Sequence, residues 1–175
     1  MKKKSALVLA VVFTFGMAAG AVAARKGIDP ALYRSKDKKE AAKELLNLAR
    51  RQAGKGSWEQ IAVGRVYYLG GMKAEGQAIF DGVTSKKPES SDWFRIARVY
   101  REAGEWNKAR EAFEKALKME PNDGKWLAEV GAYYLAKGDR AKAEEYFDRS
   151  FKAQDDEVWA TTNMAAAYLG VEPAE

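Results

Sequence analysis

Four tyrosines recur at a nearly constant spacing along the chain. Tyr67, Tyr100, Tyr134 and Tyr168 are separated by 33, 34 and 34 residues. Glycines and phenylalanines follow the same period at Gly71, Gly104, Gly138, Phe80, Phe113 and Phe147. Self-similarity at this period predicts a stack of repeated units rather than a single globular core. Such a stack presents an extended surface and usually binds a partner.

The most regular unit runs from Ser90 to Asp123. The apolar residues of its first half are spaced as one face of a helix: Trp93, Ile96, Ala97 and Tyr100. Those of its second half predict another helix: Ala109, Ala112, Phe113, Ala116 and Leu117. Gly104 lies where a turn needs a residue free to take positive φ, and Pro121 cannot continue the second helix. The unit is therefore predicted to be a helix–turn–helix.

This unit resembles the tetratricopeptide repeat (TPR), a helical hairpin of 34 residues. The resemblance implies an all-α fold. We expect a TPR helix–turn–helix solenoid with about three full repeats, a C-terminal capping helix and an N-terminal amphipathic helix. The predicted segments are repeats at residues 57–89, 90–123 and 124–157, the capping helix at 158–169 and a tail at 170–175.

The predicted N-terminal helix covers residues 36–54 and follows a linker at residues 24–35. Its apolar residues include Ala42, Leu46 and Ala49, which precede Gly76, Phe80 and Val83 by 34 residues. One interpretation is that this helix is the second helix of a degenerate repeat.

The first residues of the chain have the pattern of a targeting segment. Lys2, Lys3 and Lys4 precede an uncharged, largely apolar run that ends in Ala21-Val22-Ala23-Ala24. This pattern predicts a secretory signal peptide at residues 1–23. The alternative is an uncleaved membrane anchor, because the run is long enough to span a bilayer and Arg25 and Lys26 follow it. Either interpretation predicts an exported TPR protein of bacterial type, in the periplasm or anchored facing it.

Composition excludes several classes of function. The net charge of +5 comes from 30 basic and 25 acidic residues, and three of the lysines lie in the targeting segment. The remainder is nearly balanced, so a nucleic-acid partner is not expected. The chain has neither histidine nor cysteine, which removes the usual base near neutral pH, thiol chemistry and most zinc sites. We therefore expect no enzymatic activity, no cofactor and no metal.

The resemblance also implies where a partner binds, because the first helices of TPR units line a concave groove. The residues expected to face this groove are Arg65, Tyr68, Phe94, Arg95, Arg98, Arg101, Glu129 and Asn163. Arg95, Arg98 and Arg101 are three residues apart and are predicted to form a ridge suited to an acidic segment. The alternative is that these arginines form intrahelical ion pairs, such as Arg98 with Glu102.

Together these patterns predict a non-enzymatic adaptor or scaffold of the cell envelope that binds a protein or peptide partner, with an acidic partner favoured by the ridge. The alternative is a membrane-tethered, non-catalytic subunit or assembly factor of an envelope enzyme or secretion complex. Membrane contact is expected only if the N-terminal segment stays uncleaved.

Overall fold

The computed structural model describes residues 28–173, and this part of the chain is helical without any strand. The all-α prediction is therefore confirmed. The elements in chain order are η1 (Pro30–Leu32), α1 (Lys38–Ala53), α2 (Ser57–Leu69), α3 (Lys73–Thr84), α4 (Ser90–Glu102), α5 (Trp106–Met119), α6 (Gly124–Ala136), α7 (Arg140–Ala153) and α8 (Val158–Tyr168). The predicted signal peptide or anchor at residues 1–23 lies outside the described residues.

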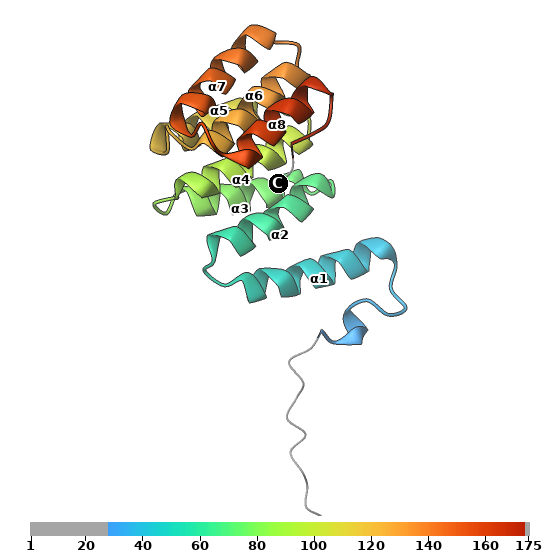
Figure 1. Cartoon of the computed structure of the whole chain (residues 1–175). Coiled ribbons are helices and arrows are strands. Elements are labelled where there is room, and N and C mark those ends of the chain that lie inside the picture. The colour runs from blue at the N-terminus through green and yellow to red at the C-terminus, as the bar shows by residue number, and fades with distance from the viewer. Residues whose placement is uncertain (1–27, 174–175) are drawn as a thin grey trace, which may run out of the picture.

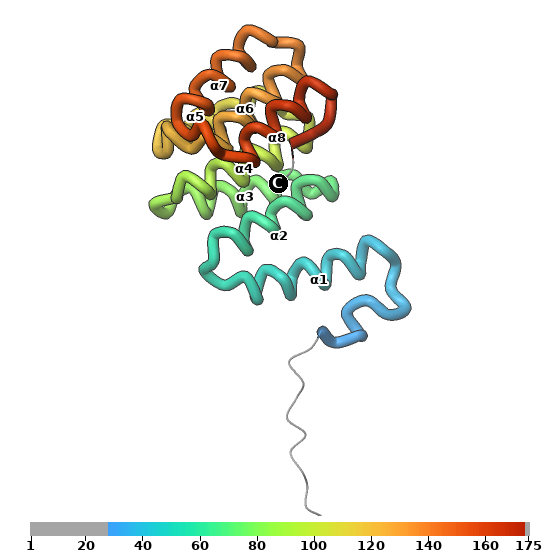
Figure 2. The backbone as a smooth tube through the Cα atoms, in the orientation of Figure 1, coloured from blue at the N-terminus to red at the C-terminus, as the bar shows by residue number. Residues whose placement is uncertain are grey.

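The helices pair in sequence order and the pairs stack along one direction (Figures 1 and 2). Helix α2 packs on α3, α4 on α5, and α6 on α7. Helix α1 closes one end of the stack against α2, and α8 packs on α6 at the other end. This arrangement is the predicted helix–turn–helix solenoid.

Aromatic side chains fill the space within and between the pairs. Phe113 and Tyr100 are buried, as the spacing in the sequence predicts. The Phe113 ring centroid lies 4.9 Å from that of Phe94 in its own pair and 5.5 Å from that of Tyr133 in the next. One continuous core therefore joins successive repeats, and burial of such large apolar side chains is the main stabilising contribution.

Two glycines show why the period includes this residue type. Gly104, in the turn after α4, has φ +76°, a conformation that side-chain-bearing residues rarely adopt. The turn lets the Glu105 N–H donate to the Tyr100 carbonyl at 2.8 Å before α5 begins. Gly131 faces α7 so closely that a Cβ there would lie 2.6 Å from Phe147 Cε1. The first glycine permits the hairpin turn, and the second permits close helix packing.

The two ends of the stack are held differently. At the N-terminal end, Leu46 of α1 packs with Val63, Tyr67 and Ile79 in a small cluster separate from the main core. At the other end, α8 buries Ala160 and Asn163. No helix within residues 28–173 has the length and apolar character needed to cross a bilayer.

Candidate functional site

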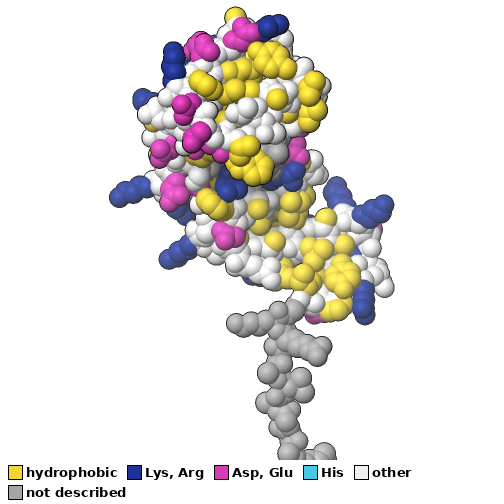
Figure 3. Space-filling model, viewed as in Figure 1, with side chains coloured by type: hydrophobic (Ala, Val, Ile, Leu, Met, Phe, Trp, Pro, Cys, Tyr) yellow, Lys and Arg dark blue, Asp and Glu magenta, His cyan; other side chains and the backbone are white. Residues whose placement is uncertain are grey.

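Helices α2, α4, α6 and α8 occupy the first-helix position of each repeat, and we call their shared face the first-helix surface. Helix α2 contacts α4, and α6 contacts α8. Two pockets open on this surface, one between α2 and α4 and one between α4, α6 and the segment that follows α8. Figure 3 shows basic side chains beside apolar ones on the face that carries α8. The first-helix surface is therefore the candidate site.

The pocket between α2 and α4 has an aromatic wall capped by an arginine. Its volume is about 130 Å³. The Arg95 guanidinium lies 3.8 Å from the centroid of the Trp58 ring, and Trp58 remains 51% exposed. Such stacking of a cation on an indole is attractive and leaves both groups accessible. At the rim, Arg65 donates two hydrogen bonds to the Glu102 carboxylate, one of them from Nε at 2.8 Å.

Beneath the surface, α4 and α6 are joined by a buried polar network. Arg98 donates from Nε and from one terminal nitrogen to the two oxygens of Glu129, at 2.7 and 2.6 Å. The Tyr133 hydroxyl donates to the same carboxylate at 2.6 Å. Burial, followed by the nearby Glu129 charge, raises the pKa of Tyr133 well above its ordinary value. Three donors thus satisfy a carboxylate that has no exposed surface.

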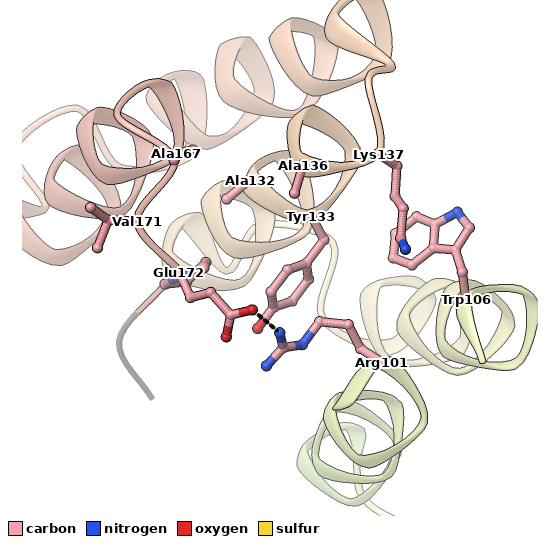
Figure 4. A pocket seen from close by; sticks show the side chains of 11 residues that line it. Arg101, Trp106, Ala132, Tyr133, Ala136, Lys137, Ala167, Val171 and Glu172 are labelled. Atoms are coloured by element: carbon pink, nitrogen blue, oxygen red, sulfur yellow. Dashed lines mark ion pairs between the residues drawn. The ribbon is translucent and has the colours of Figure 1, made fainter. Parts of the chain in front are cut away.

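The second pocket, with a volume of about 220 Å³, has Arg101 of α4 on one wall (Figure 4). The Arg101 guanidinium lies 4.7 Å from the centroid of the Tyr133 ring. One terminal nitrogen is 3.0 Å from the carboxylate of Glu172, in the segment after α8. The apolar lining includes Trp106 and Ala167. The pocket therefore combines a cation, an aromatic face and apolar walls, and the segment after α8 forms one side of it.

Four of the eight predicted groove residues do not face an open surface. Tyr68 and Phe94 are in the core, and Glu129 and Asn163 are buried as well. Tyr68 packs against the rings of neighbouring aromatic residues, while Phe94 stacks on Trp126 with centroids 4.4 Å apart. The expectation of exposure was wrong for these four because each first helix packs on the next repeat as well as on its own partner helix.

The predicted arginine ridge is also divided among three different environments. Arg95 stacks on Trp58, Arg98 binds buried Glu129, and Arg101 lines the second pocket. Arg98 pairs with Glu129 of the next first helix, and Glu102 pairs with Arg65 of the preceding one. Arg65, Arg95 and Arg101 remain on the first-helix surface, and their role in partner binding stays a prediction.

Sequence reasoning missed the residues that build the second pocket. Tyr133, Trp106 and Glu172 were not among the predicted site residues. Tyr133 immediately precedes the periodic Tyr134, so the adjacent pair of tyrosines was the available signal for a second aromatic face. For Glu172, the acidic character of the residues after α8 was a signal, but it did not indicate which cation the carboxylate contacts.

Within residues 28–173, no three histidine, cysteine, aspartate or glutamate side chains are grouped so that they could hold a metal ion. The functional groups that line the two pockets of the first-helix surface include aromatic rings, guanidinium groups and carboxylates.

The described residues form a helix–turn–helix solenoid of the tetratricopeptide-repeat kind. Residues 90–123, which contain α4 and α5, match the family model described as Tetratricopeptide repeat. The chain is also similar to Protein O-mannosyl-transferase TMTC1 of Mus musculus, with 24% identity, and of Homo sapiens, with 21% identity, in each case over 113 residues. The aligned stretch is 64% of this chain and 12% of each relative. The chain thus spans about one eighth of the length of the curated relatives it matches.

Proposed function

We propose that the chain is a non-enzymatic TPR adaptor or scaffold of the cell envelope and that it binds a protein or peptide partner through the first-helix surface. The observation that carries this proposal is the exposed Trp58–Arg95 stack beside the pocket between α2 and α4. Tryptophan and arginine are enriched among the residues that dominate binding energy in protein interfaces. An accessible pair of this kind, held by a rigid helical stack, is a preformed anchor for a partner.

The basic character of the accessible side chains favours an acidic partner. Arg95 and Arg101 both reach the first-helix surface, and Arg101 already contacts a carboxylate. A guanidinium can hold a carboxylate with two parallel hydrogen bonds, which gives specificity as well as attraction.

The envelope location rests on the N-terminal sequence alone. We propose that residues 1–23 are removed on export, so that N-terminal sequencing of protein from its native host begins at Ala24 or Arg25. Recovery of an intact Met1 in the membrane fraction supports the alternative of a membrane-tethered, non-catalytic subunit or assembly factor.

We propose no transferase activity for this chain. The name O-mannosyl-transferase belongs to relatives of which the chain covers only 12% of the length. So short an alignment carries no activity over to this chain, and binding rather than catalysis is the function proposed for its repeats.

Capture from envelope extract tests the surface. Trp58→Ala and Arg95→Gln are expected to lower partner recovery at least about tenfold, the size of a typical hot-spot loss. Phe151→Ala and Arg110→Gln are matched controls, because both residues are exposed on second helices. Equal recovery by wild type and the Trp58 and Arg95 variants, with all four variants folded, overturns the proposal.

A further inference from the structure

The segment after α8 turns back over the first-helix surface (Figures 1 and 4). Gly170 has φ +72°, and the Val171 N–H donates to the Ala166 carbonyl at 2.9 Å. This turn places Glu172 beside Arg101 of α4, two repeats earlier in the stack. Val171, Glu172 and Pro173 therefore form one wall of the Arg101 pocket, and the Glu172 carboxylate is paired with Arg101.

The Arg101 guanidinium is well suited to bind a carboxylate, but its ion pair with Glu172 uses only one of its nitrogens. Its side chain is 18% exposed, and the Tyr133 ring lies against its guanidinium. Its Nε is buried without a hydrogen-bond partner among the described residues. A buried, unpaired donor is unfavourable, and a carboxylate can accept from Nε and a terminal nitrogen together. A differently placed carboxylate can thus make a bond that Glu172 does not make.

The walls of the pocket indicate what accompanies that carboxylate. Ala132, Ala136 and Ala167 are small, and the Trp106 ring adds an apolar side. Val171 borders the pocket directly before the acid, and in Figure 4 its side chain points to the opposite side of the segment from Glu172. Pro173 disfavours a helical conformation at Glu172 and so keeps the segment extended. The pocket therefore suits an extended segment in which an acidic residue follows an aliphatic one.

The contact made by Glu172 can be displaced. The Glu172 side chain is 78% exposed, and it makes one ion pair with Arg101. Ion pairs this exposed contribute little to stability. Val171 is also more than half exposed, so the segment buries little apolar surface when it occupies the pocket.

From these observations we propose that the Arg101 pocket is the acidic-residue subsite of the first-helix surface. Its ligand is an extended segment of a partner protein in which an acidic residue follows an aliphatic one, and Val171–Pro173 occupy the subsite in cis until that segment displaces them. This inference rests on the proposed function, because it assumes that the first-helix surface binds a protein. It adds the chemistry of the bound residue and an intramolecular competitor.

A peptide titration on the full chain tests both parts. The probe is a fluorescent peptide, blocked at both ends, that copies residues 168–173, and a second probe replaces its glutamate with glutamine. Glu172→Gln is expected to bind the first probe several-fold more tightly than wild type. The gain is about tenfold if the segment fills the pocket nine tenths of the time, because apparent affinity scales with the open fraction. Asp156→Asn, an exposed change of the same charge, should leave the affinity at the wild-type value.

The pocket itself is tested by Arg101→Gln in the Glu172→Gln background. This change should reduce binding of the glutamate probe to that of the glutamine probe, whereas Arg110→Gln should not. Arg101→Lys keeps the charge but loses the planar fork, so it should also bind more weakly. Melting curves by circular dichroism confirm that each variant is folded, and the lysine variant serves if Arg101→Gln does not fold.

Three results overturn the inference: equal affinity of wild type and Glu172→Gln, equal binding of the two probes, or no binding of either probe to Glu172→Gln. These results leave the proposed function intact when partner capture still depends on Trp58 and Arg95. The proposed function fails instead if the Trp58→Ala and Arg95→Gln variants capture the partner as well as wild type does.

Discussion

Arg65 and Arg98 occupy equivalent positions in two successive repeats, yet they have different environments. Each donates two hydrogen bonds to a glutamate of the next first helix. The Arg65 and Glu102 side chains are 47% and 36% exposed, whereas those of Arg98 and Glu129 are 16% and 0% exposed. The same residue at the same repeat position is thus solvated at the N-terminal junction and buried at the next one.

Neighbouring side chains account for the difference. The Tyr133 hydroxyl adds a third donor to Glu129, and the Phe94 ring lies 5.2 Å from the Arg98 guanidinium. In the preceding repeat, the position equivalent to Tyr133 is Val99, which has no hydroxyl. Aromatic cover and complete hydrogen bonding allow the Arg98–Glu129 ion pair to be buried, where it joins two helices of the core. A charge available to a partner therefore has to be sought where aromatic cover and complete hydrogen bonding do not coincide.

The largest expected effect comes from breaking the buried pair. Arg98→Ala leaves the Glu129 carboxylate inside the protein without its cationic partner. We expect the free energy of unfolding to fall by about 3–5 kcal/mol, as is typical when one member of a buried ion pair is removed. Urea denaturation followed by circular dichroism measures the change. A loss below about 1 kcal/mol would show that Arg98 and Arg65 are equivalent after all.

Removing the whole polar network should cost less than removing one member. Arg98→Met, Glu129→Leu and Tyr133→Phe together remove both charges and the hydroxyl of this network, so none of its members is left without a partner. Buried ion pairs are often replaced by apolar groups with little loss, so we expect stability within about 1–2 kcal/mol of wild type. Comparison with the three single variants by urea denaturation gives the coupling between them. A triple loss equal to the sum of the single losses contradicts this interpretation.

The exposed pair should respond weakly and to a different variable. Arg65→Ala is expected to lower the free energy of unfolding by less than about 1 kcal/mol, because water competes for both groups. The small effect should shrink further as salt is raised, since exposed charges are screened over about 8 Å at physiological ionic strength. Melting temperatures of wild type and Arg65→Ala at low and high salt provide the measurement. A difference that grows with salt argues against an electrostatic origin.

The comparison also shows how far the sequence could predict this molecule. The repeat of Tyr67, Tyr100 and Tyr134 was sufficient for the all-α solenoid, because each helix carries its own periodic apolar face. The packing of Phe113 between the helices followed from the same pattern. Local spacing of this kind is the strongest signal that a single sequence contains.

The site was less predictable because its contacts join residues that are distant in the chain. Arg98 and Glu129 are 31 residues apart, and no local pattern links them. The burial of Phe94 depends on Trp126 in the next repeat, and the position of Glu172 depends on a turn after α8. Three arginines at regular spacing on one helix therefore predicted one ridge, while tertiary packing gave each of them a different partner.

The smallest expected effect concerns a cluster around Glu105, which joins the same two repeats as the Arg65–Glu102 pair. Its carboxylate accepts hydrogen bonds from Lys108 at 2.8 Å, Lys73 at 2.6 Å and the Tyr68 hydroxyl at 2.7 Å. These bonds, that of Lys108 first, lower the pKa of Glu105 to about 2. A glutamate in an unfolded chain has a pKa of about 4.3. The contribution of Glu105 to stability is therefore fully present above that value and is lost as the pH falls through about 2.

Glu105→Gln tests whether the stability that Glu105 contributes depends on pH. We expect it to lower the melting temperature at pH 6 by an amount equivalent to no more than about 1 kcal/mol, since solvent reaches the cluster. The difference from wild type should narrow between about pH 4.5 and 2, because the wild-type carboxylate then becomes neutral as well. Glu120→Gln, which makes the same charge change at an exposed position, is the control for net charge. An undiminished difference at pH 2 would mean that Glu105 stabilises the junction by its shape rather than by its charge.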